Sequence, residues 1–262
     1  MKKNMSRVYI AVASLTLLVV PVAQAQIITN TDTAANYGGV GEPNWTNGAN
    51  GGSGFGAWNL FTTGTAGNFL GSSSSQGFGN IDTSGQSFGM YGNPSGDNYF
   101  NAERSFSSSL NTGDTFSINL ALAFRNGNKG ISLYSGGFAP ANEVWNFNVG
   151  GDNYTAGGSN LGWAYSQTSI FNLLATQTGA NTYSISLTRG GDLYTTNISG
   201  LGGLSGFKMY VGSTDAGNDL NNLFANSLQT TIVPEPTTHA MLALGALALA
   251  GYTWRRRQRS RS

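Results

Sequence analysis

The clearest pattern along the chain is a strict alternation of apolar and polar side chains near its middle. Between residues 116 and 124, every second position is apolar, beginning with Phe116, Ile118 and Leu120. A period of two places alternate side chains on opposite faces of a β-strand. The same pattern recurs in three further segments: residues 145–149, 183–187 and 207–211. These segments predict half-buried strands, with one face toward a core and the other toward water.

The predicted core consists of the apolar members of these alternating segments. They include Phe116, Ile118, Leu120, Leu122, Phe124, Phe147, Tyr183, Ile185 and Leu187. Asn126 and Gly127 follow the first segment and supply the positive φ that a hairpin turn needs. Similar glycine-rich turns occur at residues 150–153, 157–160, 190–192 and 202–203. About a dozen short strands at such spacing predict an all-β fold, an antiparallel two-sheet sandwich of the jelly-roll type.

The stretch from residue 29 to residue 75 is rich in glycine, asparagine and serine, with isolated aromatic residues. It is either a loose entry region or the first strands of the sandwich. Residues 57–61 are apolar enough to pair with another strand, which favours the second interpretation. We therefore expect one domain over residues 26–233.

The N-terminus has the composition of a secretory signal peptide. Three basic residues precede an apolar stretch at residues 8–22, and Ala23 and Ala25 form a small-residue cleavage pattern behind Pro21. A permanent N-terminal anchor is the alternative, but the cleavage pattern is well placed after the proline. We predict that residues 1–25 are removed during export.

The C-terminus, residues 234–262, combines three elements in order. Pro234 and Pro236 stiffen the backbone on either side of Glu235, so this segment stays extended and can be read by a binding cleft. An apolar run at residues 241–254 follows, long enough with its flanks to approach the roughly 30 Å that a transmembrane helix must cross. Five arginines complete the tail and should stay cytoplasmic: Arg255, Arg256, Arg257, Arg259 and Arg261.

These three elements resemble the PEP-CTERM sorting signal of Gram-negative bacteria, which is processed by exosortase, an integral membrane protease similar to transpeptidases. The resemblance implies that Pro234, Glu235 and Pro236 form the recognition motif and that the arginines form the membrane stop. The implied partners are exosortase, the Sec export machinery and, before processing, the membrane that the C-terminal helix crosses. The expected location is the cell surface or the extracellular matrix. A plain C-terminal anchor is the alternative.

The net charge of the body differs from that of the whole chain once the two terminal segments are left out. Residues 26–233 hold five basic and eleven acidic residues, a net charge of −6, whereas the whole chain carries +1. Such a body has no basic patch to neutralise phosphates, which argues against nucleic acid as a partner. The chain has no cysteine, and its single histidine, His239, lies in the tail. Ser-His-Asp, Cys-His and His-zinc mechanisms are therefore excluded for the body.

The body also resembles the concanavalin A-like jelly rolls of bacterial surface proteins. The residues that carry this looser resemblance define strands and turns rather than sites: residues 104–106, 113–117, 126–130 and 145–150. The resemblance implies the fold and an association with carbohydrate.

Two kinds of acidic residue are candidates for chemistry. Glu103 and Glu143 are the only reasonable acid and base for a glycoside hydrolase, yet the clustered Glu-x-Asp-x-x-Glu strand of jelly-roll glucanases is missing. We therefore expect no catalytic residue. Asp152, Asp215 and Asp219 lie in glycine-rich loops and are the candidates for Ca²⁺, although none has EF-hand spacing. No other cofactor is expected.

Aromatic residues provide the candidates for glycan contact. Trp163 and Tyr165, with Asn160 nearby, combine stacking rings with a hydrogen-bonding amide. Trp145 alternates with Phe147 and is expected in the core. The leading interpretation is an exported, non-catalytic surface or matrix protein associated with exopolysaccharide. A carbohydrate-binding module is the first alternative, and a glycoside hydrolase is the second.

Overall fold

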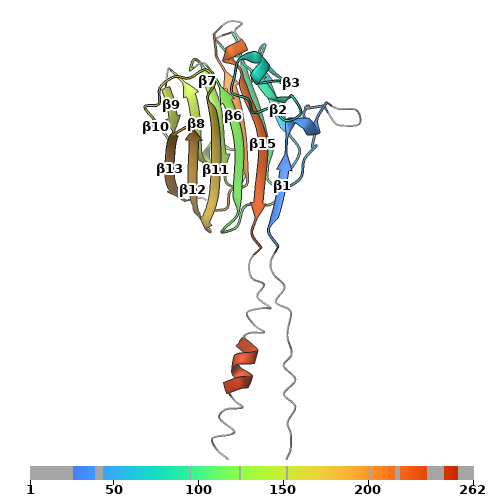
Figure 1. Cartoon of the computed structure of the whole chain (residues 1–262), viewed down its shortest axis with the longest axis vertical. Coiled ribbons are helices and arrows are strands. Elements are labelled where there is room, and N and C mark those ends of the chain that lie inside the picture. The colour runs from blue at the N-terminus through green and yellow to red at the C-terminus, as the bar shows by residue number, and fades with distance from the viewer. Residues whose placement is uncertain are drawn as a thin grey trace, which may run out of the picture. The chain divides into compact units, whose positions relative to one another are not determined.

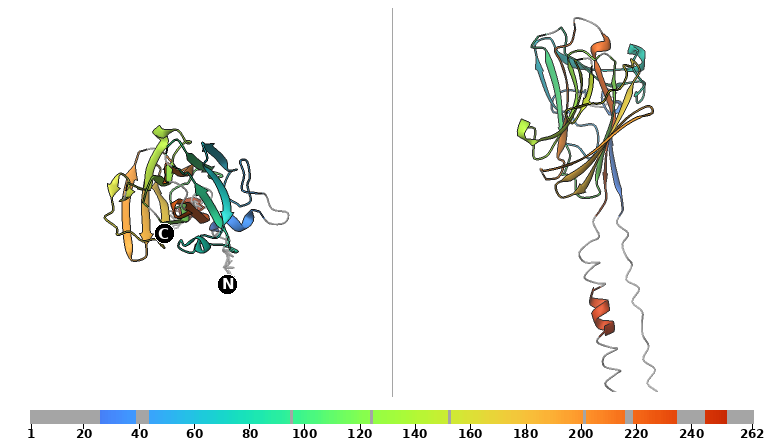
Figure 2. Two further views of the ribbon diagram at one scale, coloured as in Figure 1. Left: turned by 90° about the horizontal axis from the view of Figure 1, so that it is seen from above. Right: turned by 90° about the vertical axis from the view of Figure 1, so that its left-hand side faces the viewer.

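The computed structural model describes residues 26–38, 44–94, 96–123, 125–151, 153–200, 202–215, 219–234 and 245–252. Gln26–Pro234 form one compact unit. Within its described residues, fifteen strands build two antiparallel sheets that pack face to face (Figure 1). Figure 2 shows the two sheets as separate layers. The predicted all-β two-sheet sandwich is confirmed.

The eight-stranded sheet has the order β13-β12-β11-β6-β15-β4-β3, and β1 pairs with β15. Its strands are β1 (Ile28–Asp32), β3 (Gly67–Gly71), β4 (Ser87–Tyr91), β6 (Thr115–Leu122), β11 (Ile170–Gly179), β12 (Thr182–Arg189), β13 (Asp192–Ser199) and β15 (Leu223–Ile232). The last strand, β15, therefore lies inside the sheet, between β6 and β4. This sheet faces the viewer in Figure 1.

The seven-stranded sheet has the order β10-β9-β8-β7-β14-β5-β2. Its strands are β2 (Asn59–Thr63), β5 (Tyr99–Ser105), β7 (Asn128–Tyr134), β8 (Glu143–Gly150), β9 (Asn153–Ala156), β10 (Ser159–Asn160) and β14 (Gly206–Gly212). Short 3₁₀ helices lie in the connections: η1 (Ala34–Asn36), η2 (Ser74–Gln76), η3 (Pro140–Asn142) and η4 (Asp219–Asn221). The hairpin turn before β7 contains Gly127, whose φ of 64° agrees with the predicted turn chemistry.

The core between the sheets contains the side chains that the alternation predicts. Those described are fully buried: Phe116, Ile118, Leu120, Leu122, Phe147, Tyr183, Ile185 and Leu187. Phe124 lies outside the described residues. The core is unusually aromatic, and the rings of Phe116 and Phe207 stack at 5.0 Å across the two sheets. Trp45 and Trp58 are also buried in this core. The entry stretch is therefore part of the sandwich, as we favoured.

A second, smaller hydrophobic cluster lies on the outer face of the eight-stranded sheet. Ala121 and Ala123 should face water according to the alternation, but both are buried under the loop at residues 72–82, with Phe78 and Ile81. This loop is held by Asp82, whose carboxylate accepts hydrogen bonds from four serine hydroxyls, those of Ser72, Ser73, Ser74 and Ser87. Although burial raises the pKa of Asp82, these donors hold it well below its usual range.

The two ends of the body meet in one strand pair. Ile28 of β1 lies opposite Ile232 of β15 in an antiparallel register. The next residue, Val233, donates its backbone N–H to Asp114 Oδ1 at 2.7 Å. The residues after the predicted signal cleavage and the residues before the sorting motif are therefore neighbours in one sheet.

Outside the compact unit, residues 245–252 form a short helix. No described helix is long and apolar enough to span a membrane. Several predictions fall on residues that the structure does not describe: the signal peptide with Ala23 and Ala25, Glu235 and Pro236 of the sorting motif, the five tail arginines and both ends of the apolar run at residues 241–254.

Candidate functional site

The outer face of the seven-stranded sheet carries a polar depression of about 500 Å³, which we call the tyrosine trough. Because alternate residues of each strand point away from the core, five strands contribute side chains to it. Its lining consists of Tyr99, Asn101, Asn128, Ser132, Glu143, Asn146, Asn148, Thr155, Lys208 and Tyr210. Amides, hydroxyls and two phenol rings dominate this surface.

The strand registers align outward-facing residues into one row that crosses the whole sheet. Its members are Phe61, Asn101, Tyr210, Gly130, Asn148, Thr155 and Asn160, one from each strand. Six interstrand spacings of about 4.8 Å make this row roughly 29 Å long. Phe61 at one end is 49% exposed. A long polymer laid across the strands would meet polar groups, with one exposed ring at the end.

Tyr210 is the third of the seven members of the row and lies next to Gly130, the central one. Its Oη accepts a hydrogen bond from Asn146 Nδ2 at 2.8 Å and lies 3.1 Å from Asn148 Oδ1, to which it donates. Burial raises the pKa of Tyr210 well above its usual range, so the phenol stays protonated at neutral pH. Gly130 beside it has no room for a side chain, since a Cβ would lie 1.9 Å from the Phe147 carbonyl oxygen and 3.0 Å from Tyr210 Oη. The Tyr210 hydroxyl therefore occupies space that a side chain at position 130 would need.

One cationic and two anionic side chains lie in or beside the trough. Lys208 lies opposite Glu103 in the register, and its Nζ is 5.2 Å from the centre of the Tyr134 ring. Tyr134 Oη in turn donates a hydrogen bond to Glu143 Oε2 at 3.1 Å. Burial raises the pKa of Glu103, and the nearby Lys208 ammonium opposes this rise. One ammonium between two carboxylates gives the surface no strong field of either sign.

Glu103 and Glu143 are on the same face but are not neighbours. Their strands, β5 and β8, are separated by β14 and β7, which amounts to roughly 14 Å between strand axes. Glycosidase carboxylates lie about 5 to 9.5 Å apart. Lys208 and Tyr134 stand on the intervening strands, so the two glutamates do not form an acid and base pair around one bond.

The predicted glycan contacts are divided between different surroundings. Trp163 is half-buried and packs against the core, with the Phe171 ring nearly parallel at 6.3 Å and the Arg189 guanidinium 5.0 Å from its centre. Tyr165 is exposed, and the Arg125 guanidinium lies 5.4 Å from its ring. These aromatic residues and arginines form a packed cluster at one end of the sandwich.

Asn160 belongs instead to the far end of the row across the seven-stranded sheet. Its Nδ2 donates to Asn153 Oδ1 at 2.9 Å, and its Oδ1 accepts the Gly162 N–H at 2.9 Å. A glycan role for Trp163, Tyr165 and Asn160 as one site remains a prediction.

Two of the three calcium candidates, Asp215 and Asp219, are described by the structure. Asp152 is outside the described residues, Asp215 accepts a hydrogen bond from Asn126 Nδ2 at 2.6 Å, and Asp219 begins η4. Within the described ranges, no three acidic or histidine side chains gather closely enough to hold a metal ion.

Sequence reasoning missed the residues at the centre of the trough. Asn146 and Asn148 alternate with Trp145 and Phe147, and Tyr210 alternates with the apolar residues of β14. The alternation places each of these polar residues on the outer face of some sheet. Only the strand register shows that β8, with Asn146 and Asn148, and β14, with Tyr210, share the same outer face.

Comparison with known proteins identifies the tail. Residues 233–257 match the PEP-CTERM protein-sorting motif, which confirms the predicted sorting signal. The chain is therefore an exported, exosortase-processed surface protein of a Gram-negative bacterium. No curated protein matches the chain.

Several solved structures are similar to the chain at low identity. A protein of unknown function from Shewanella oneidensis MR-1 is 10% identical with a TM-score of 0.44, over 87% of this chain and 95% of that one. The exoplasmic domain of VIP36, in a form bound to Ca²⁺ and mannose, is 8% identical with a TM-score of 0.39, over 68% and 83%. An alginate lyase from Alteromonas sp. 272 is 13% identical with a TM-score of 0.34, over 54% and 82%.

Proposed function

We propose that this exosortase-sorted protein is a non-catalytic component of the cell surface or extracellular matrix whose body binds exopolysaccharide along the tyrosine trough. The observation that carries the proposal is the row of outward-facing residues that crosses all seven strands, with Tyr210 next to its central member, Gly130. A row of roughly 29 Å suits several sugar units of an extended chain rather than a single small molecule.

The chemistry of the row supports a hydroxyl-rich ligand. Side-chain amides such as those of Asn101 and Asn148 donate and accept at once, as vicinal sugar hydroxyls do. The exposed ring of Phe61 and the ring of Tyr99 offer apolar faces to sugar C–H groups. Because a neutral polysaccharide carries no charge for Lys208 or the two glutamates to attract or repel, its affinity should depend little on salt.

The same geometry supports a binding role rather than catalysis. The Tyr210 phenol, with its raised pKa, is a poor base at neutral pH. Glu103 and Glu143 stand on strands too far apart to share one glycosidic bond. The body also contains no histidine. We therefore expect the ligand to leave the protein unchanged.

A polysaccharide array tests this proposal. The exported protein, purified from its native cells, is applied to an array of neutral and acidic polysaccharides that includes the exopolysaccharide of those cells. We expect retention on at least one polysaccharide and no shortening of its chains in the supernatant. The absence of binding to every polysaccharide would overturn the binding function, and release of shorter sugars would overturn the non-catalytic one.

A further inference from the structure

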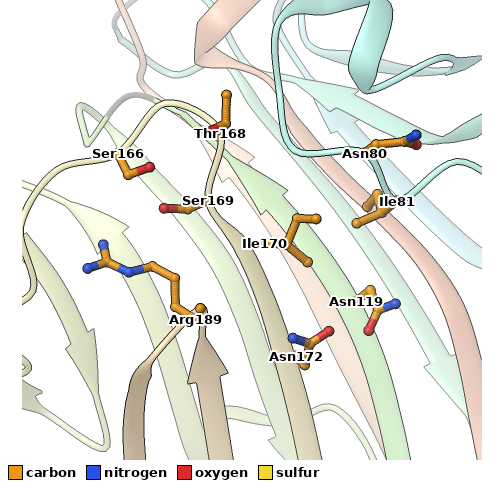
Figure 3. A pocket seen from close by; sticks show the side chains of 10 residues that line it. Asn80, Ile81, Asn119, Ser166, Thr168, Ser169, Ile170, Asn172 and Arg189 are labelled. Carbon is orange, nitrogen blue, oxygen red and sulfur yellow. The ribbon is translucent and has the colours of Figure 1, made fainter.

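The outer face of the eight-stranded sheet carries a second depression, of about 660 Å³, which we call the asparagine groove (Figure 3). Its lining consists of Asn80, Ile81, Asn119, Ser166, Thr168, Ser169, Ile170, Asn172, Arg189 and Gly190. The two sheets pack with their inner faces together, so this groove and the tyrosine trough open on opposite sides of the sandwich.

The floor of the groove is formed by two neighbouring strands. Asn119 of β6 and Asn172 of β11 are opposite each other in the register, and Figure 3 shows their amides side by side below Ile170. Asn80 and Ile81 stand on one side, and the segment with Ser169 stands on the other. Amides beside an isoleucine side chain provide both hydrogen bonds and an apolar contact.

The walls of the groove are fixed before any ligand arrives. Gly79 lets the 72–82 loop approach so closely that a Cβ there would lie 2.4 Å from Ile170 Cγ1. Asn226 donates from Nδ2 to the Ile81 carbonyl at 2.9 Å. Gln167 Nε2 reaches the Gly77 carbonyl at 3.4 Å and so joins the two walls. A rigid groove loses little conformational entropy on binding.

One buried polar group in this groove lacks a partner within the described parts of the chain. Ser169 is only 5% exposed, and its buried Oγ makes no hydrogen bond there. Buried polar groups are nearly always hydrogen-bonded in native proteins, so the unpaired Ser169 hydroxyl points to a partner from a water molecule or a ligand hydroxyl.

The charge of the lining argues for a neutral ligand. Arg189 is its one charged residue, and the guanidinium is already engaged. Nε and one terminal nitrogen donate to Asp192 Oδ2 at 3.0 and 2.5 Å, and the other terminal nitrogen donates to the Ala164 carbonyl at 2.6 Å. Amides and hydroxyls around isoleucine side chains match the hydroxyls and C–H faces of a neutral saccharide.

We propose that the asparagine groove is a second saccharide site and that the body, with one site on each sheet, cross-links polysaccharide chains. The inference rests on the proposed function, since it assigns the second contact of the same polysaccharide. A body with two opposed sites joins two chains, and many such bodies on long chains form a network through multivalency.

Stoichiometry and network formation test the inference together. The probes are the exopolysaccharide of the native cells and oligosaccharides of about six units cut from it. Titration calorimetry of the exported protein with the oligosaccharide should give two sites per chain. Light scattering with the full polysaccharide should rise to a maximum as protein is added and then fall. In excess, each protein molecule binds only one polysaccharide chain, and the bridges between polysaccharide chains are lost.

Variants separate the two sites. Asn119→Ala with Asn172→Ala, and independently Thr168→Trp, which fills the groove from an exposed position, should each reduce two sites to one and abolish the scattering maximum. Asn197→Ala, an exposed asparagine on β13 outside both depressions, is the matched control and should change neither readout. Circular dichroism and thermal unfolding verify that each variant folds.

The outcomes distinguish this inference from the proposed function. One site in the wild type, unaffected by the groove variants, would overturn the second site and leave the trough in place. No binding by the wild type would overturn the proposed function and the inference with it. Two sites without a scattering maximum would overturn the cross-linking.

Discussion

Arg104 on β5 forms an ion pair with Asp32 on β1, and both side chains are fully buried between the two sheets. Arg104 also donates to the Gly56 carbonyl at 2.9 Å and to Asn50 Oδ1 at 2.7 Å. Asp32 accepts a further hydrogen bond from Tyr37 Oη at 2.7 Å. Since β1 is the first strand after the predicted signal peptide, this ion pair anchors the N-terminal edge of the body.

Breaking the ion pair should destabilise the body strongly. Arg104→Met leaves the Asp32 carboxylate buried without its cation, and we expect the free energy of unfolding to fall by about 3 to 5 kcal/mol. Chemical denaturation measures this loss. The double variant Arg104→Met with Asp32→Leu, which removes both charges, should recover part of it. A loss below about 1 kcal/mol in the single variant would contradict a structural role for the pair.

Lys129 on β7 is fully buried, and its Nζ donates to Asn126 Oδ1 at 3.1 Å. Burial lowers the pKa of Lys129 to about 7, although the Asp215 carboxylate opposes this shift. In the unfolded chain the lysine keeps its proton up to a pH of about 10. Between these two values the unfolded state binds more protons than the folded state, so stability rises with pH.

We expect the free energy of unfolding to increase by about 1 to 2 kcal/mol between pH 7 and pH 9. Urea denaturation across this range measures the change. The pH series should end at pH 9, because tyrosines of the unfolded chain titrate near pH 10 and would add their own contribution. Lys129→Met should flatten the profile. An equal rise in wild type and variant would assign the effect to other groups.

Gly130 should not tolerate a side chain, because a Cβ at this position would lie 1.9 Å from the Phe147 carbonyl oxygen. Gly130→Ala therefore forces β7 and β8 apart under the trough, and we expect a loss of about 1 to 3 kcal/mol in unfolding free energy. Gly191→Ala is the matched control, since a Cβ there meets nothing within 4 Å. Equal melting temperatures of the two variants would be incompatible with the described packing.

The sorting motif should determine both the mass of the processed protein and its location in the cell. Replacing Pro234, Glu235 and Pro236 with alanine should leave the tail attached and keep the protein from its normal destination in the native host. Alanine replacement of Thr237 and Thr238 is the neighbouring control. Intact mass and cell fractionation report the result. Normal mass and location of the triple variant would instead indicate a plain C-terminal anchor.

The alternation of apolar and polar residues was enough to predict the fold class and most of the core, because burial on one face of a strand is a local property. It was not enough for Ala121 and Ala123, since the loop that covers them comes from residues 72–82. The Arg104 and Asp32 pair joins positions 72 residues apart in the chain. A single sequence carries no local signal for such a contact.

The candidate site was still less accessible from the sequence. The sequence suggested Trp163 as a residue that contacts glycan. In the structure its ring packs against Phe171 and Arg189. The trough depends on the order of seven strands, in which β14 lies between β5 and β7. That order brings Tyr210 beside Asn146 although the two are 64 residues apart. Register between distant strands follows from packing of the whole sandwich rather than from any one segment.

The central claim is that the tyrosine trough binds polysaccharide, and the dissociation constant of one matched pair of variants tests it most directly. Asn148→Ala removes an amide from the middle of the row, and Asn197→Ala removes an exposed amide from β13 on the other sheet. One lost hydrogen bond of about 0.5 to 1.5 kcal/mol corresponds to a Kd roughly 2 to 12 times higher. We predict that increase for Asn148→Ala and none for Asn197→Ala, measured by affinity electrophoresis in the polysaccharide that the array identifies. Equal Kd values for both variants and the wild type would contradict the claim.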